Sequence, residues 1–341
     1  MKKVVFSIFI LILSIFGYII SITPLYQEID INNALEEARL ALKNNQEIII
    51  INSKNPFNFY DIFTRIDEIS NQKVYAILTK PDTIGTFPLI IGVAGSAGWD
   101  NHHFGYLDRY LKKGFAVMSL HSFKSRKVTS TVGEQLSVTI PMVVYDAFMA
   151  LKELNKDKNI LIDNVGITGW SLGGGVALFT AWAPIQEQIS PNLMFAAHLP
   201  FYPPCMIVPN ELRFTNKPIH ILAGELDDWV PAEACKELSD IAEEFDYNID
   251  LTIYKDASHS FDRTTDVVFN PNAYSFTNCR MKLTSKGIVA LNNGFKLSSP
   301  VLQKIGLAFC AEKGAHWGGN EFARLSSSDF AISFMEQNLR E

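Results

Sequence analysis

The residue best suited to chemistry in this sequence is Ser171, within the pentapeptide Gly-Trp-Ser-Leu-Gly at residues 169–173. An apolar run precedes it at residues 165–168 and a run of small and apolar residues follows at 174–183. This pattern predicts a strand, a very tight turn and a helix. Such a turn strains the backbone at the serine and requires nearby glycines, because a Cβ would collide with adjacent backbone. The hydroxyl is then exposed at a helix N-terminus, which favours a nucleophilic serine over the alternative of an ordinary glycine-rich turn.

A nucleophilic serine needs a general base to take its proton, and the base needs a carboxylate to orient it. His259 follows the apolar run at residues 249–254, so it would overhang the carboxyl end of a strand. His316 is the alternative base, but it lies in a glycine-rich stretch with no strand before it. His198 and His220 precede the best acid, which breaks the chain order of serine, acid and histidine. We therefore predict that His259 is the base.

The acid of this predicted triad lies in the segment that follows the apolar run at residues 219–223. Asp227 is the favoured candidate and its neighbour Asp228 is the alternative. Either carboxylate could instead cap the helix expected over residues 232–245. The adjacent pair therefore predicts one catalytic acid and leaves a capping or turn role for the other.

Acyl transfer at a serine also requires two N–H donors for the developing oxyanion. One donor is expected to be the backbone N–H of Leu172, the residue after the nucleophile. The other is expected in the loop at residues 94–98, which follows the apolar run at residues 88–93 and has no bulky side chain. Ser96 is the favoured residue there, and an ordinary glycine turn is the alternative.

Apolar runs alternate with segments of helical periodicity along most of the chain. We expect strands at residues 47–52, 74–78, 88–93, 115–120, 165–168, 194–199, 219–223 and 249–254, and helices at residues 27–45, 102–113, 141–154, 174–183, 232–245 and 322–339. This alternation predicts an α/β fold with a mainly parallel, doubly wound sheet flanked by helices. Residues 264–317 are rich in Asn, Gly and Ser without a clear period, so we expect long loops there.

The N-terminus carries a second kind of signal. Lys2 and Lys3 precede an uncharged, largely apolar run over residues 4–22, just before Pro24. The run is long enough to span a bilayer and lacks a small-x-small cleavage site, which favours an uncleaved anchor over a cleaved signal peptide or a buried helix. The positive flank predicts a cytoplasmic N-terminus and an extracytoplasmic, periplasmic or exported remainder of the chain.

Length and net charge limit the number of domains and the kinds of partner that we expect. The 341 residues suffice for one large α/β domain, and the net charge of −6 gives no basic footprint for nucleic acid. We divide the chain into an anchor or signal segment (residues 1–23), a lead-in region (residues 24–72) and the main α/β domain (residues 73–341).

The four cysteines fit an oxidising compartment, in which an even count suggests two disulfides. Cys205 follows an expected strand end and Cys235 begins the helix after the next strand, whereas Cys279 and Cys310 both lie in the late, loop-rich segment. We therefore favour Cys205–Cys235 with Cys279–Cys310 among the three connectivities. Four buried free thiols are the alternative.

With these residues identified, the chain resembles the dienelactone hydrolase family of α/β-hydrolases, and in particular its serine branch, often found in exported bacterial proteins. The resemblance covers the chain from about residue 74 to the C-terminus. It implies an α/β-hydrolase fold with Ser171, Asp227 and His259 as its triad. The matching segments are residues 121–126, 169–175, 201–205, 224–231 and 257–262.

Three departures from the family pattern limit what the resemblance implies. Ser171 stands where the founding enzymes use cysteine, so their lactone specificity does not carry over. Ala94 replaces the histidine usual before the oxyanion glycine, and His121 replaces a common aspartate. Arg126 could bind a substrate carboxylate, although a structural ion pair is the favoured interpretation. Trp170, beside the serine, is a second candidate substrate contact.

These observations together predict a serine hydrolase that cleaves a carboxylic ester or lactone through an acyl-enzyme. Its expected partners are a small-molecule substrate and, through an uncleaved residue 4–22 segment, a membrane. Neither a metal nor an organic cofactor is implied. A peptidase or acyltransferase on the same fold is one alternative, since fold and triad would be shared, and a non-catalytic envelope protein is another.

Overall fold

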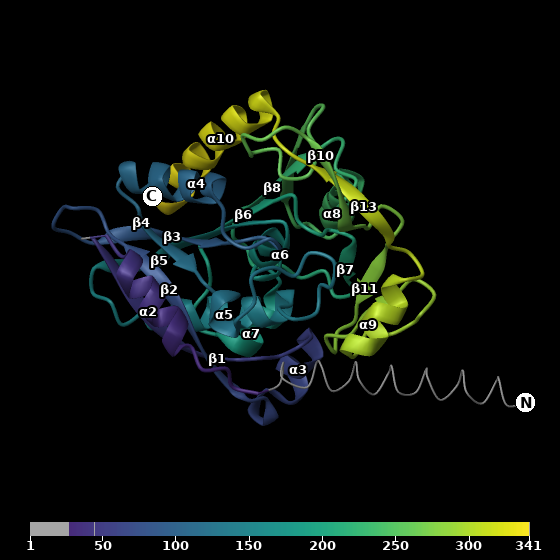
Figure 1. Ribbon diagram of the computed structural model, residues 1–341, viewed down its shortest axis with the longest axis horizontal. Coiled ribbons are helices and arrows are strands. Elements are labelled where there is room, and N and C mark those ends of the chain that lie inside the picture. The colour runs from purple at the N-terminus through teal and green to yellow at the C-terminus, as the bar shows by residue number, and fades with distance from the viewer. Residues whose placement is uncertain (1–26, 44, 341) are drawn as a thin grey trace, which may run out of the picture.

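The computed structural model describes residues 27–43 and 45–340, and its centre is a twisted eight-stranded sheet (Figure 1). The strands β4, β3, β5, β6, β8 and β9 run parallel, and β1 and β2 add an antiparallel edge. In sheet order they are β1 (Gln46–Lys54), β2 (Asn71–Thr79), β4 (Ala116–Leu120), β3 (Phe87–Val93), β5 (Ile160–Trp170), β6 (Ala197–Phe201), β8 (Ile219–Gly224) and β9 (Ile249–Tyr254). The predicted mainly parallel α/β-hydrolase sheet is therefore confirmed.

Helices cover both faces of this sheet. The helices α4 and α10 lie together on one face, and α5, α6 and α7 lie on the other (Figure 1). Their apolar sides account for the helical periodicity of the sequence, and residues of β3, β4 and β5 are buried between the two layers. The bounds are α2 (Asn32–Ala41), α3 (Phe59–Thr64), α4 (Asn101–Lys112), α5 (Ile140–Leu154), α6 (Leu172–Phe179), α7 (Ala183–Ile189), α8 (Ala232–Glu243), α9 (Pro300–Leu307) and α10 (Glu321–Leu339), with short 3₁₀ turns at Ile66–Glu68 and Lys124–Arg126.

The prediction of long loops over residues 264–317 is wrong in part. This stretch contains β10 (Val268–Ser275), β11 (Met281–Leu283), β12 (Val289–Leu291), α9 and β13 (Glu312–Trp317). The strand β10 pairs with β13, while β11 pairs with β12 and with β7 (Ile207–Pro209), a strand that follows β6. Strands of three residues are too short to show a sequence period, and β7 pairs with a strand more than seventy residues later in the chain.

Smaller departures concern the ends of elements, as two examples show. The helix expected over residues 27–45 is α2, which is shorter and begins at Asn32. The strand expected over residues 194–199 is β6, which begins at Ala197 because the preceding apolar residues are part of the loop. Phe195 in that loop is nevertheless buried in the core, so burial there does not require a strand.

The membrane segment predicted at residues 4–22 lies outside the described residues. None of the helices in the described part of the chain has the length and apolarity that crossing a bilayer requires.

Two disulfides join loops and helices at the edge of the domain. Cys205, which follows β6, is bonded to Cys235 of α8, and Cys279, which precedes β11, is bonded to Cys310 after α9. The predicted connectivity is confirmed. The second bond ties the start of the small β7–β11–β12 sheet to the segment that leads into β13.

Replacing both Cys279 and Cys310 with serine is expected to lower the free energy of unfolding by about 3–4 kcal/mol, because the unfolded chain regains the entropy of an uncrosslinked loop of roughly 30 residues. Urea unfolding followed by circular dichroism measures this change. The unchanged chain in excess reductant serves as the control and should shift in the same direction. A loss below about 1 kcal/mol would contradict the expectation.

Candidate active site

Ser171 lies in the turn between β5 and α6, and its backbone has φ 55° and ψ −113°. This conformation is rare for a side chain other than glycine, and the flanking contacts explain why the chain holds it. A Cβ at Gly169 would lie 2.1 Å from the carbonyl oxygen of Gly173, and a Cβ at Gly173 would lie 2.1 Å from the carbonyl oxygen of Val93. The strand, tight turn and helix predicted from the pentapeptide are therefore present, with the serine at the helix N-terminus.

Three side chains from separate loops form a continuous chain of hydrogen bonds. The His259 Nε2 atom lies 3.0 Å from Ser171 Oγ, and His259 Nδ1 lies 2.7 Å from Asp227 Oδ2. The other carboxylate oxygen of Asp227 accepts the backbone N–H groups of Trp229 and Val230, at 2.9 Å each. This arrangement assigns Nδ1 as the donor to the carboxylate and leaves Nε2 free to accept from the hydroxyl.

The imidazole of His259 is held tightly in its loop after β9. Its residue is 2% exposed, and the rings of Tyr202 and Trp229 each lie with their centroids 4.8 Å from it. Its carbonyl oxygen accepts the backbone N–H of Gly318 at 2.9 Å, which joins the loop to the segment after β13. Packing and hydrogen bonding thus fix both the position and the orientation of the ring.

The two alternative candidates, Asp228 and His316, pair with each other instead. Asp228 Oδ2 lies 2.7 Å from His316 Nδ1, and Asp228 Oδ1 accepts the backbone N–H of His316 at 2.8 Å. Both side chains are about half exposed. Neighbouring carboxylates in the same loop therefore bond to different histidines, and only Asp227 reaches the histidine that contacts the serine.

The predicted oxyanion donors lie beside the serine. Leu172 begins α6, and the loop carrying Ser96 lies so close that a Cβ at Gly95 would be 3.3 Å from Ser171 Cβ. Among the described residues, the backbone N–H groups of Leu172 and Ser96 have no acceptor. The Ser96 hydroxyl donates to Gln135 Oε1 at 3.3 Å, so the side chain is engaged while the backbone N–H is not. The two amides are thus available to a ligand.

Trp170 is fully buried behind the serine. Its ring packs against Trp99, His103, Tyr106 and Phe201, with centroid separations between 4.5 and 6.3 Å. This aromatic cluster packs around the last residue of β5. A direct substrate contact by Trp170 stays a prediction, and the packing favours a structural role.

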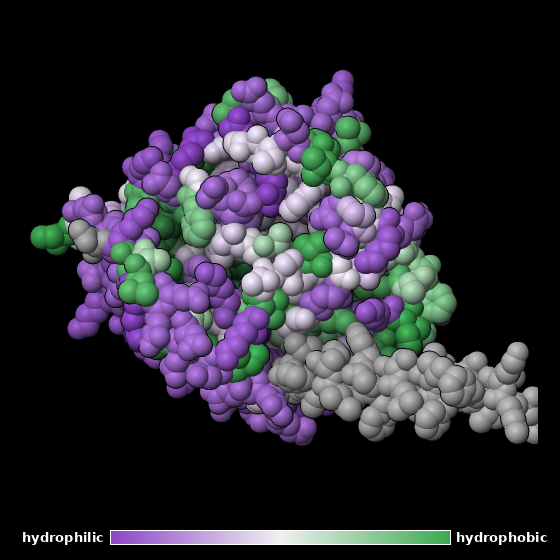
Figure 2. All heavy atoms as spheres, viewed as in Figure 1, coloured by the Kyte–Doolittle hydropathy of each residue, from purple (hydrophilic) through white to green (hydrophobic). Residues whose placement is uncertain are grey.

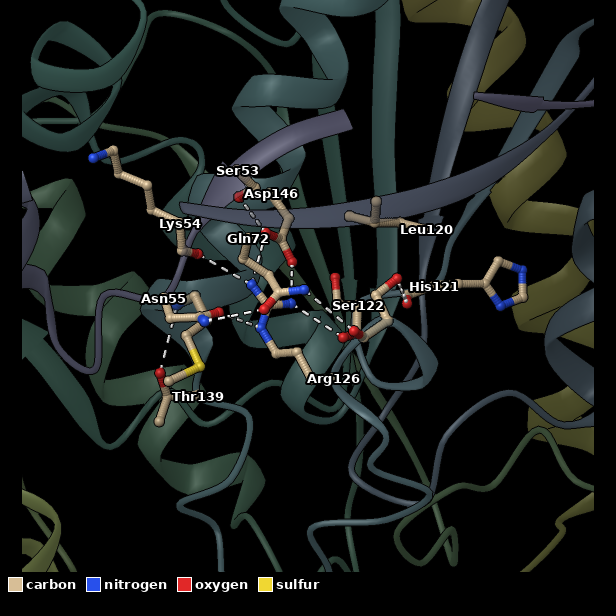
Figure 3. A network of polar contacts seen from close by, with 12 residues as sticks. Ser53, Lys54, Asn55, Gln72, Leu120, His121, Ser122, Arg126, Thr139 and Asp146 are labelled. Carbon is tan, nitrogen blue, oxygen red and sulfur yellow. Dashed lines mark hydrogen bonds and ion pairs between the residues drawn. The ribbon is translucent and has the colours of Figure 1, made fainter. Parts of the chain in front are cut away.

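Arg126 lies in a buried polar network at the edge of the sheet (Figure 3). Its guanidinium binds the carboxylate of Asp146 through both terminal nitrogens, at 2.7 and 3.0 Å. The remaining donors bind Asn55 Oδ1 and the carbonyl oxygens of Ser122 and Lys54, at 2.7, 3.1 and 3.1 Å. All five N–H groups of an arginine are thereby used. This favours the structural ion pair over binding of a substrate carboxylate.

His121, which replaces a common family aspartate, lies near this network. It stacks on Tyr75 with the centroids 4.8 Å apart, and its Nε2 atom lies 3.0 Å from Ser119 Oγ. Burial lowers the pKa of His121 to about 3, so its ring is neutral near pH 7. The histidine therefore contributes packing rather than charge to this part of the fold.

Two cavities meet at Ser171. The larger has a volume of about 140 Å³ and is lined by Ser171, Leu172, Ser96 and mostly apolar side chains from α3, α5, α6, β7, β11, β12 and α9. The smaller is lined by Ser171 and by polar and aromatic residues that include His103, Tyr202, His259, Arg263 and Trp317. Among the described residues, no three His, Cys, Asp or Glu side chains converge as a metal site would require.

Residues 74–284, more than half of the chain, match the model of the dienelactone hydrolase family. The chain belongs to this family. A probable 2-oxo-3-(5-oxofuran-2-ylidene)propanoate lactonase from Bradyrhizobium sp. is 23% identical over 198 residues, which are 54% of this chain and 78% of the relative. The structure of esterase 2 from Thermogutta terrifontis is 15% identical, with a TM-score of 0.48 over 64% of this chain and 84% of that one.

Several residues around the serine make contacts that the sequence does not predict, although Tyr202 and Asp262 lie in segments that resemble the family. Tyr202 packs on His259 and donates its hydroxyl to the buried Asp262 at 2.7 Å. Burial raises the pKa of Tyr202 well above its usual value, so it remains a neutral donor. Arg263 binds Asp100 at 2.7 Å and lies over the Trp317 ring. Only the three-dimensional contacts place these residues at the site.

The Arg126 network yields a prediction about stability. Replacing Asp146 with alanine leaves a buried guanidinium without its carboxylate, so the free energy of unfolding is expected to fall by about 3–5 kcal/mol. Chemical unfolding of the full chain measures this. The matched control is Glu187→Ala, which removes one of the two carboxylate partners of the exposed Arg213 and should cost less than about 1 kcal/mol. Equal losses in the two variants would show that the network is not a major structural constraint.

Proposed function

We propose that this member of the dienelactone hydrolase family is a serine hydrolase that cleaves a carboxylic ester or lactone through an acyl-enzyme. The observation that supports this most directly is the hydrogen-bonded chain from Ser171 through His259 to Asp227, at 3.0 and 2.7 Å. Such a chain supplies a nucleophile, its base and the group that orients the base.

In the proposed reaction, Ser171 Oγ attacks the substrate carbonyl carbon while His259 Nε2 takes the hydroxyl proton. Asp227 holds the imidazole through Nδ1 and stabilises the imidazolium that forms. The carbonyl oxygen becomes an oxyanion that accepts hydrogen bonds from the backbone N–H groups of Leu172 and Ser96. The C–O bond then breaks, and the leaving alkoxide takes the proton from His259. Water activated by His259 releases the acid and restores the serine.

The surroundings of Asp227 support its proposed role. Two backbone N–H groups bind one of its oxygens, so the other is aimed at His259 and the carboxylate cannot easily rotate. A fixed carboxylate selects the imidazole tautomer whose Nε2 faces the serine. Peptidase or acyltransferase activity would use the same residues, and no observation in the structure favours either over hydrolysis of an ester.

We further propose that the enzyme acts outside the cytoplasm. The two disulfides support this, because such bonds persist in oxidising compartments. In this proposal residues 1–23 form a membrane anchor or signal segment, residues 4–22 hold the protein at the membrane, and residues 24–72 lead into the hydrolase domain that follows from residue 73.

A fluorophosphonate probe is expected to label the full chain with one equivalent at Ser171, because the activated hydroxyl attacks phosphorus as it would a carbonyl carbon. Intact-mass spectrometry measures the label. Ser171→Ala should abolish it, whereas Ser333→Ala, which changes an exposed serine on α10, should not. Stoichiometric labelling of the Ser171→Ala variant would contradict the assignment of Ser171 as the nucleophile.

The adjacent aspartates provide a matched test of the acid. Asp227→Asn is expected to lower kcat for a p-nitrophenyl ester by about 10³–10⁴-fold, because the amide favours the wrong tautomer of His259. Asp228→Asn keeps a side chain that can bind His316 and should leave kcat within a few-fold of the unchanged enzyme. Steady-state kinetics of the two variants decides this, and the reverse order of losses would assign the acid to Asp228.

A further inference from the structure

The two cavities at Ser171 lie on chemically different sides of the serine, which fixes what each can hold. The leaving alkoxide must take its proton from His259 Nε2, so the alcohol portion of a substrate has to lie beside that histidine. His259 lines the smaller cavity together with Ser171. The lining of the larger cavity includes Ser171, Leu172 and Ser96 but not His259. The acyl portion of the substrate therefore extends into the larger cavity.

The walls of this larger cavity, which we call the acyl cavity, carry no Asp, Glu, Lys, Arg or His side chain. Two of its polar wall groups donate to carbonyl oxygens of the protein. The Thr139 hydroxyl donates to the Phe57 carbonyl oxygen at 2.9 Å, and the Gln303 side chain donates to the Gln135 carbonyl oxygen at 3.0 Å. A charged acyl group would lose its hydration there without gaining a counter-ion, which is strongly unfavourable.

Part of the acyl cavity comes from segments outside the residues that match the dienelactone hydrolase family. Phe57 and Phe59 precede that match, and Val289, Leu297 and Leu307 follow it. These two segments meet directly, because the Tyr60 backbone N–H donates to the Gly287 carbonyl oxygen at 2.9 Å. The cavity is therefore a property of this chain and cannot be read from the family motifs.

We propose, building on the serine hydrolase function above, that the enzyme selects esters of uncharged, apolar acids whose acyl group fills this cavity. A cavity of about 150 Å³ in another protein binds benzene, so a volume of about 140 Å³ holds an acyl group of roughly four to eight carbons or a single ring. Each methylene buried in the cavity should raise kcat/KM about fourfold.

The test uses p-nitrophenyl esters of unbranched acids with the full-length protein. The kcat/KM is expected to rise from acetate to hexanoate by about 250-fold if all four added methylenes are buried, and to fall beyond about eight carbons. The p-nitrophenyl monoester of adipate, which has the same chain length as hexanoate but ends in a carboxylate, should react at least about 100-fold more slowly than hexanoate. A flat or falling profile from acetate, or equal rates for the hexanoate and adipate esters, would overturn the proposal.

A pair of variants on α9 locates the effect. Leu307 lines the acyl cavity, so Leu307→Trp should lower the ratio of hexanoate to acetate kcat/KM by at least about 10-fold. Ile305 is 47% exposed on the same helix, where apolar side chains gather on the face shown in Figure 2, and Ile305→Trp should leave that ratio unchanged. Equal ratios in the two variants would overturn the placement of the acyl group.

The two proposals fail in different ways. Absence of all ester hydrolysis, together with absence of fluorophosphonate labelling at Ser171, would overturn the serine hydrolase function and the acyl selectivity with it. Hydrolysis that depends on Ser171 but ignores acyl length and charge would overturn the selectivity alone. The profile of the unchanged enzyme decides between these outcomes even if Leu307→Trp does not fold.

Discussion

The close contact between the turn at Ser171 and the end of β3 governs the rest of the site. A single methyl group at Gly173 would lie 2.1 Å from the Val93 carbonyl oxygen, so α6 can begin where it does only because that position lacks a side chain. This contact places the N-terminus of α6 beside the loop after β3. It therefore brings Ser171, Leu172 and Ser96 together in the lining of the larger cavity, where the backbone N–H groups of Leu172 and Ser96 have no acceptor among the described residues. The strain at the serine is sustained because packing on both sides leaves the turn no alternative.

The histidine side of the site depends on a different set of constraints, supplied late in the chain. Asp228 holds His316 in β13, and Gly318 just beyond β13 donates to the carbonyl oxygen of His259. The exposed Asp228–His316 pair thus joins the loop after β8 to the strand whose end lies against the loop of His259. Two aspartates that are neighbours in sequence consequently bind two different histidines: Asp227 contacts the buried His259, and Asp228 contacts the exposed His316.

Sequence reasoning succeeds here where a local pattern determines the structure. The long apolar runs of β3 and β5 predict buried strands, and the glycines around Ser171 predict the tight turn. It fails where the structure depends on distant partners. The strand β7 is three residues long, and its pairing partner β11 lies more than seventy residues later in the chain. Likewise, the role of Arg126 is decided by the acceptors that surround it, which no spacing in the sequence reveals.

The proposed chemistry of this enzyme depends on local sequence patterns, whereas its proposed selectivity depends on contacts between distant segments. The proposed triad and oxyanion donors all lie within the family match at residues 74–284, where the sheet fixes their relative positions. The acyl cavity instead closes where the segment before α3 and the segment around α9 meet, on either side of that match. Changes in these outer segments can reshape the cavity without moving the serine, the histidine or the aspartate. Relatives that share the family motifs can therefore share the reaction and still differ in the acids that they release, so the substrate must be inferred from the walls of this cavity rather than from the motifs.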